Sequence, residues 1–119
     1  MQNYKDLKVW TKAHAFTLKI YEVTQMFPKE ELYSLTNQIR RAASSIPANI
    51  AEGCGKRTSP DFQKFLNISL GSTNEAEYFL ILSHDLKYIT KPSFIELSIL
   101  INEIKAMLIG LIAKVQRST

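Results

Sequence analysis

The chain has 119 residues, 45% of them hydrophobic and 22% charged, with four glycines, four prolines, one cysteine and a net charge of +4. This composition is typical of one globular domain, residues 1–119, and excludes a low-complexity chain, an internal disulfide and a cysteine-rich zinc site. The sequence has no apolar run long enough for a membrane span and no signal-peptide core, so we expect a cytoplasmic protein without membrane contact.

The first predicted helix covers residues 6–26, where apolar residues recur mostly at three- and four-residue steps. The lysines in and just before this segment fall on roughly the opposite face: Lys5, Lys8, Lys12 and Lys19. The sequence "FPKEE" then breaks the pattern, because proline disfavours helix in the residue before it.

A second helix is predicted over residues 34–53, with Ser34 as its N-cap and with Gly53 and Gly55 at an end where the backbone turns left-handed. Pro47 lies inside its apolar pattern. Proline has no N–H to donate to the carbonyl of Ala43, and its ring clashes there, so we expect a kink at Pro47. Ser44 and Ser45 could then bond the freed backbone.

The second half of the chain predicts two further helices. One covers residues 60–89, with Ser59 as cap; the other starts with Ser93 as cap and Glu96 completing a capping box, and ends near residue 116. Strand-like alternation is missing throughout. The fold class is therefore predicted to be all-α, an antiparallel up-down four-helix bundle.

The last two helices carry a second apolar ridge beside the stripe that would face the core. On the fourth helix this ridge contains Ile95, Ile99, Ala106 and Ile109, and on the third Ile68, Phe79, Leu82 and Leu86. A helix that is apolar on two sides is buried on two sides. We therefore predict a homo-oligomer whose interface includes Ile95, Ile99, Ile109 and Phe79; the alternative is a thick internal core.

The stretch "RRAASSIPANIAEGCG", residues 40–55, and the basic surplus of residues 1–57 suggest an acidic partner. The predicted RNA- or DNA-backbone contacts are Lys8, Lys12, Lys19, Arg40, Arg41, Lys56 and Arg57. The alternative is structural: a bent, closely packed second helix whose charges are solvated or paired with carboxylates of neighbouring helices. No motif for sequence-specific recognition is present.

Little in the sequence indicates catalysis. The two histidines are His14 and His84, and the pair His84–Asp85 lacks the further histidines of metal phosphohydrolases. No Glu-x-x-His motif of a di-iron bundle occurs. We therefore expect no enzyme, no catalytic residue, no metal and no cofactor; an enzyme using His84 and Asp85 is a third hypothesis.

Several segments resemble the four-helix-bundle family of 23S rRNA intervening-sequence proteins, also called the S23 ribosomal protein family. They are "LKVWTKA", the ordered pattern "FP..E.Y.LT.QIRRAA.SIP.NIAEG.G..S..DF..FL.I..GS" and "EAEYFL". The resemblance implies a ring-shaped homopentamer. Some members are encoded inside ribosomal RNA genes, and relatives are accessory scaffolds for nucleic acid and a reverse transcriptase; no catalytic role attaches to the motif.

Two functions are therefore weighed. The first is a non-enzymatic homo-oligomeric bundle that binds RNA or DNA through its backbone. The alternative is a protein-interaction scaffold without a nucleic-acid role, in which the basic residues only solvate the surface.

Overall fold

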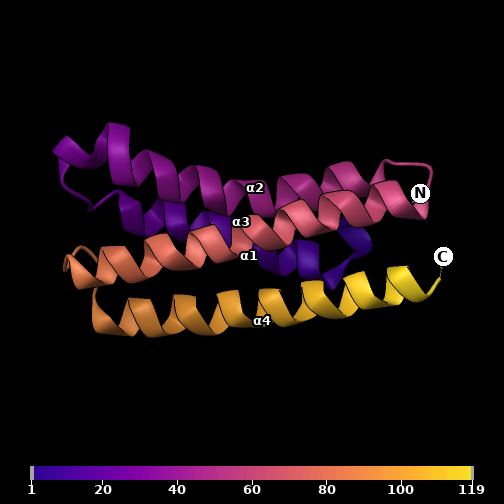
Figure 1. Ribbon diagram of the computed structural model, residues 1–119. Coiled ribbons are helices and arrows are strands. Elements are labelled where there is room, and N and C mark those ends of the chain that lie inside the picture. Colours follow the sequence, from indigo (N-terminus) through magenta and orange to yellow (C-terminus); the bar gives the residue numbers. More distant parts are fainter. Residues whose placement is uncertain (1, 119) are drawn as a thin grey trace.

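The computed structural model describes residues 2–118, which form four long helices lying side by side in alternating directions (Figure 1). They are α1 (Lys8–Thr24), α2 (Asn37–Cys54), α3 (Ser59–Asp85) and α4 (Lys91–Arg117). Three short turns complete the chain: η1 (Tyr4–Asp6), η2 (Lys29–Glu31) and the π-helical η3 (Leu32–Thr36). The described part contains no strand. The prediction of an all-α, up-down four-helix bundle is thus confirmed.

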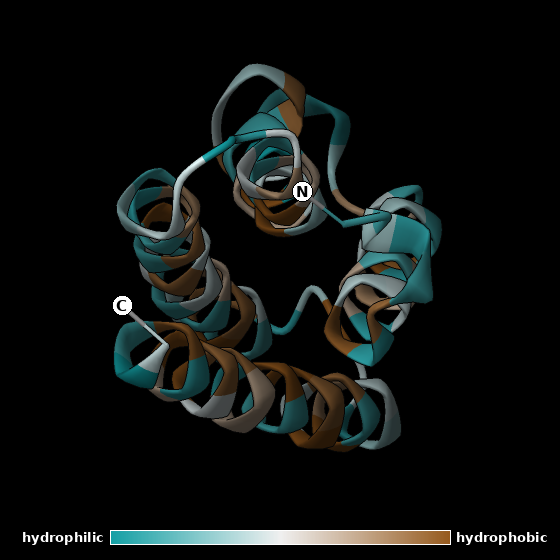
Figure 2. Cartoon of the chain, turned by 90° about the vertical axis from the view of Figure 1, so that its right-hand side faces the viewer, coloured by the Kyte–Doolittle hydropathy of each residue, from teal (hydrophilic) through white to brown (hydrophobic). Residues whose placement is uncertain are grey.

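Each helix packs against the next one in the chain, and α4 closes the bundle against α1. Figure 2 shows the four helices arranged around one central axis. The bundle measures 46 × 24 × 20 Å. Within residues 2–118, no helix has both the length and the hydropathy needed to cross a bilayer.

The core is built from apolar residues that recur at three- and four-residue steps along the helices. The largest fully buried hydrophobic side chains are Phe16, Ile20, Ile39, Ile46, Ile50, Leu66, Leu80, Leu97, Ile101, Ile104 and Leu108. On α3 the buried line also contains small polar residues. Ser69 Oγ donates to the carbonyl of Ile46 at 2.8 Å, so α3 joins α2 by a buried hydrogen bond as well as by packing.

Three predicted helix caps are wrong. Thr58 caps α3 by accepting from the Asp61 N–H at 3.3 Å, and Thr90 caps α4 by accepting from the Ser93 N–H at 3.3 Å. Both helices begin one residue after a threonine in extended conformation, which is a good capping residue. Ser34 lies inside η3, before α2 begins.

The predicted left-handed backbone at Gly53 and Gly55 is also wrong. Among the described residues, only Lys87 has a positive φ, of 66°, in the turn after α3. Gly53 instead lies where α2 and α3 approach closely. A Cβ built on Gly53 would lie 3.0 Å from Phe62 Cδ1 and 3.1 Å from Phe65 Cβ.

Pro47 is buried inside α2, which continues through it from Asn37 to Cys54. The carbonyl of Ala43, which Pro47 cannot bond, lies 3.0 Å from Thr17 Oγ1 of α1, a hydrogen bond between helices. Thr17, and not Ser44 or Ser45, is therefore the group that can bond the freed carbonyl. Its single hydroxyl proton also faces the carbonyl of Ala13, which lies 2.9 Å from Oγ1. A kink at Pro47 is not confirmed and stays a prediction.

At the end of the bundle where α2 begins, Glu31 joins two connections. One of its carboxylate oxygens accepts from Ser34 Oγ at 2.6 Å and the other from the Tyr88 hydroxyl at 2.8 Å. The hydrogen bonds from Ser34 and Tyr88 lower the pKa of Glu31. The bond to Glu31 also raises the pKa of Tyr88.

We expect this network to lose its stabilising effect in acid. A carboxyl with a lowered pKa in the folded state stabilises the fold above its unfolded pKa, and this contribution is lost as the pH falls through the folded pKa. The difference in unfolding midpoint between the parent chain and Glu31→Gln should therefore shrink as the pH falls below the ordinary value of 4.5. A difference that stays constant with pH would contradict this role of Glu31.

Candidate functional site

One end of the bundle carries most of the excess positive charge, and we call it the basic end. It consists of residues 2–8, 52–64 and 114–118, which lie together at the right of Figure 1. These segments contain seven Lys or Arg and three Asp or Glu. The basic residues are Lys5, Lys8, Lys56, Arg57, Lys64, Lys114 and Arg117. The excess positive charge is therefore concentrated at one end of the bundle, with equal contributions from the two halves of the sequence.

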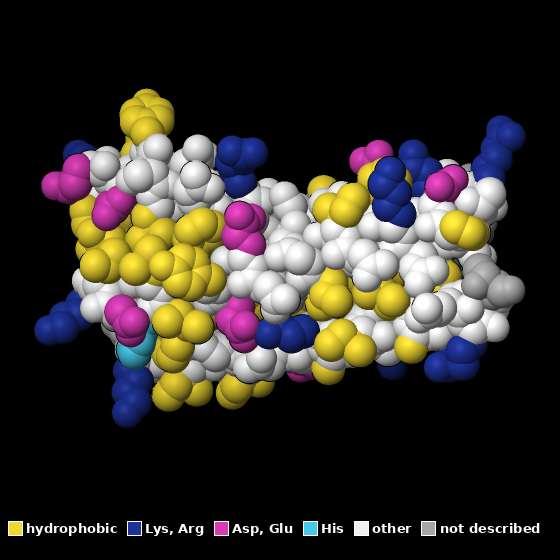
Figure 3. All heavy atoms as spheres, in the orientation of Figure 1, with side chains coloured by type: hydrophobic (Ala, Val, Ile, Leu, Met, Phe, Trp, Pro, Cys, Tyr) yellow, Lys and Arg dark blue, Asp and Glu magenta, His cyan; other side chains and the backbone are white. Residues whose placement is uncertain are grey.

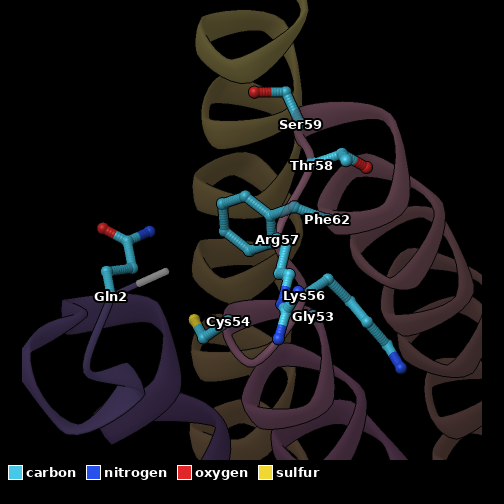
Figure 4. Close-up of a pocket in the computed structure, with 8 residues that line it drawn as sticks. All are labelled: Gln2, Gly53, Cys54, Lys56, Arg57, Thr58, Ser59 and Phe62. Atoms are coloured by element: carbon cyan, nitrogen blue, oxygen red, sulfur yellow. The ribbon is translucent and has the colours of Figure 1, made fainter.

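A cavity of about 230 Å³ opens at the basic end, where the N-terminal segment meets the turn between α2 and α3 (Figure 4). Its lining residues are Gln2, Gly53, Cys54, Lys56, Arg57, Thr58, Ser59 and Phe62. The turn is short because the N–H groups of Gly55 and Lys56 bond back to the carbonyls of Glu52 and Gly53 at 3.1 and 3.0 Å. The N–H of Gln2 reaches the carbonyl of Cys54 at 3.4 Å and holds the N-terminal segment nearby.

Cys54 lines this cavity but is 3% exposed. Burial raises the pKa of its thiol, so the reactive thiolate is disfavoured. The environment of Cys54 therefore suits a packed side chain and not a nucleophile.

Two of the seven predicted nucleic-acid contacts pair with carboxylates of α4. Lys12 pairs with Glu103, and Lys19 pairs with Glu96 at 2.7 Å. The bond to Glu96 also raises the pKa of Lys19. Because each phosphate would have to compete with an existing carboxylate, these lysines are less available than free cations.

Arg40 is turned toward the bundle. Its Nε donates to Thr24 Oγ1 at 2.8 Å, and its guanidinium carbon lies 4.9 Å from the centre of the Tyr21 ring. Arg40 pairs with no carboxylate in residues 2–118. Arg41, the next residue, is exposed. Its side chain makes no hydrogen bond, ring contact or ion pair with a described residue.

The other predicted cations lie at the basic end. Lys56 lies 3.9 Å from Glu52 and 5.0 Å from the centre of the Phe65 ring. Lys8 and Arg57 are exposed and have no ion pair in the described chain. Arg41 and Lys56 are about 15 residues apart, or about 20 Å along a helix. The seven residues therefore do not share one compact patch, and their role in nucleic-acid binding stays a prediction.

The predicted oligomer residues of α4 lie on its outward face. Ile95, Ile99 and Ile109 are 46%, 63% and 53% exposed. Phe79 of α3 is only half-exposed, because its ring packs partly against the core and lies 5.7 Å from the ring of Tyr78. The three isoleucines are thus free of the chain's own core, whereas Phe79 belongs in part to it.

The histidines are held by aromatic stacking. His14 stacks on Trp10 at 5.1 Å between ring centres, and His84 stacks on Phe94 at 4.1 Å. In residues 2–118, no group of three or more His, Cys, Asp or Glu side chains could hold a metal ion. The arrangement offers no catalytic constellation around His84 and Asp85 in the part described.

The model of the 23S rRNA-intervening sequence protein family matches residues 5–110. The chain belongs to this family. The 23S rRNA-intervening sequence fold is also seen in a crystal structure from Bacteroides thetaiotaomicron, a protein of unknown function from the S23 ribosomal protein family. The two chains are 31% identical, with a TM-score of 0.81 over 87% of this chain and 97% of that one. No curated protein matches the chain.

Proposed function

We propose that this member of the 23S rRNA-intervening sequence family is a non-enzymatic subunit of a homo-oligomeric scaffold, joined through the outward face of α4. The observation that carries the proposal is the α4 stripe, which consists of Ile95, Ile99, Asn102, Ala106 and Ile109. All five residues are exposed. Their spacing alternates between four and three residues, which is the pattern of a helix that packs lengthwise against another helix.

The surroundings of the α4 stripe support this assignment. Glu96 and Glu103 pair with lysines of α1, while Lys105 pairs with Glu77 of α3 at 2.8 Å. The charges beside the stripe are thus satisfied within the subunit, and the apolar stripe between them has no partner. Asn102 lies within the stripe, at the kind of position where a single polar residue fixes the register of packed helices.

A closed ring needs a second surface, because subunits related by a five-fold rotation join through two different patches. Hydrophobic side chains gather over the half of the visible face where α2 begins and α3 ends (Figure 3). Exposed hydrophobic side chains near the start of α2 and in the second half of α3 and just after it include Tyr33, Tyr78 and Leu86, at 91%, 58% and 45%. They offer the complementary patch for the homopentamer that the family resemblance implies.

Light scattering of the purified chain tests the scaffold. A mass about five times that of the 13.6 kDa subunit supports the pentamer, and a single-chain mass would overturn the assignment of the α4 stripe. The 260/280 nm absorbance ratio of the same peak reports nucleic acid carried by the protein.

Binding of RNA or DNA backbone is the second part of the proposal, and it rests on the basic end. A ring would bring several basic ends into one assembly, which multiplies the charge that meets phosphates. A modest net charge per subunit can then suffice. The rival is a scaffold whose partner is another protein.

Charge reversal distinguishes these two functions. We expect Lys56→Glu with Arg57→Glu to weaken binding of labelled single-stranded RNA and to reduce the slope of log affinity against log salt by about 1.4, for two lost phosphate contacts. The matched control is Lys29→Glu with Lys91→Glu, at the opposite end of the bundle, which should leave the slope unchanged. Fluorescence anisotropy at several salt concentrations measures both. Absent binding, or equal loss in both variants, would favour the protein-partner scaffold.

A further inference from the structure

A second cavity, of about 330 Å³, lies at the opposite end of the bundle from the basic end. It is lined by the end of α1, the connection that follows and the start of α2. Phe27, Pro28 and Leu32 supply apolar walls. The polar lining residues are Thr24, Gln25, Lys29, Thr36 and Arg40, so two cations and no anion face this cavity.

Thr36, which lines this site, carries an unpartnered hydroxyl. Its side chain is 3% exposed, and its Oγ1 is the one buried side-chain oxygen or nitrogen of residues 2–118 without a hydrogen-bond partner. A buried hydroxyl that loses its bonds to water destabilises the fold unless something replaces them. Thr36 also ends the π-helical turn η3, a local structure that is frequent at functional sites.

Arg40 supplies an uncompensated charge on the same face. It follows Thr36 by four residues, so the two side chains leave neighbouring turns of one helix. Its Nε is fixed by Thr24 and its plane is held near the Tyr21 ring, while no carboxylate of the described chain pairs with it. The terminal guanidinium nitrogens keep their N–H groups, which match the two oxygens of a carboxylate.

We propose that this pocket binds a small organic anion, a carboxylate joined to an apolar group. Its carboxylate accepts from Arg40 and from the hydroxyl of Thr36, and its apolar group packs against Phe27 and Leu32. The volume is at the lower limit of small-molecule sites, which are mostly apolar with a few polar groups that fix orientation. The apolar walls disfavour a hydrated phosphodiester backbone, so the proposal is independent of RNA binding at the basic end.

Amide NMR spectra of the full, isotope-labelled chain test the proposal with sodium benzoate as the probe and neutral benzamide as its uncharged counterpart. Benzoate should shift amides of residues 24–40 and saturate with a Kd near 1 mM, the range expected of so small a ligand. Benzamide should bind at least about tenfold more weakly, because it offers no charge to Arg40.

Two variants probe the polar groups, and a neighbour serves as control. Thr36→Val keeps the shape and removes only an unpartnered hydroxyl, so it should fold normally and weaken benzoate binding about three- to tenfold. Arg40→Lys should weaken it about tenfold, because lysine cannot offer two parallel N–H groups. Arg41→Lys, exposed and outside the pocket, should change nothing.

Several outcomes would overturn the proposal. They are equal binding of benzoate and benzamide, shifts confined to other residues, and no saturation at about 10 mM. Tighter binding of inorganic phosphate than of benzoate would also overturn the proposal, because it would mean that the apolar walls do not contribute to binding. An unchanged affinity of Thr36→Val for benzoate would also overturn it, because it would show that water, and not the carboxylate, bonds this hydroxyl.

Discussion

Ile99→Asp is expected to reduce the solution mass of the assembly to that of one 13.6 kDa chain. Ile99 is the most exposed of the isoleucines in the α4 stripe, at 63%. Covering an isoleucine contributes about 1.5–3 kcal/mol, and an aspartate in its place leaves an unpaired carboxylate in an apolar interface. A combined loss of about 4 kcal/mol at each contact corresponds to about a thousandfold weaker association.

The fold itself should survive this change, because Ile99 points away from the core of its own subunit. Leu18→Asp is the matched control, since Leu18 is 58% exposed on α1 and lies outside the α4 stripe. Circular dichroism should show both variants equally helical, and light scattering should show dissociation only for Ile99→Asp. An intact assembly in Ile99→Asp, or dissociation in both variants, would contradict the role of the α4 stripe.

Which face of each helix is buried follows largely from information that is local in the sequence. Apolar residues at three- and four-residue steps define the buried face of each helix, and residues such as Ile46, Leu80 and Ile104 are fully buried as this periodicity requires. The helix ends are less well determined because adjacent residues compete for the same role. Thr58 and Ser59 are both good caps, and the backbone before Pro60 uses the first of them.

The availability of the basic residues depends on contacts between helices. Lys12 and Lys19 are seven residues apart, as are Glu96 and Glu103, so two antiparallel neighbours in one register form both pairs. The equal spacing was a signal in the sequence, but it could be used only once α1 and α4 were placed side by side. Periodicity alone gives the face of a helix and not the neighbour that this face meets.

The pocket at Thr36 and Arg40 had no signal of its own in the sequence. A threonine at a helix start is ordinarily interpreted as a cap, and an arginine on α2 as a solvated or phosphate-binding charge. Their significance comes from burial, from the missing partner of one hydroxyl and from the apolar walls that the α1–α2 connection brings beside them. These are properties of the packed chain.

Gly53 also has a role that depends on packing, and we expect its replacement to destabilise the fold strongly. A Cβ at this position would lie 3.0 Å from Phe62 Cδ1, 3.1 Å from Phe65 Cβ and 3.3 Å from the Phe62 carbonyl oxygen. The Phe62 ring can rotate away, but Phe65 Cβ and the Phe62 carbonyl are fixed by the α3 backbone. We expect Gly53→Ala to cost about 1–2 kcal/mol and Gly53→Val about 3 kcal/mol, as overpacking forces α2 and α3 apart.

Gly71 provides the matched control for this prediction. It lies inside α3, and a Cβ there would meet nothing within 4 Å. Gly71→Ala should therefore stabilise the protein by about 1 kcal/mol, because alanine favours helix over glycine. Chemical unfolding of the three variants measures their free energies of unfolding, which we expect to fall on replacement of Gly53 and to rise on replacement of Gly71. If Gly53→Ala were stabilising as well, the close approach of α2 and α3 would not require glycine. The two helices could then separate at the basic-end cavity, which Gly53 and Phe62 line, without a loss of stability.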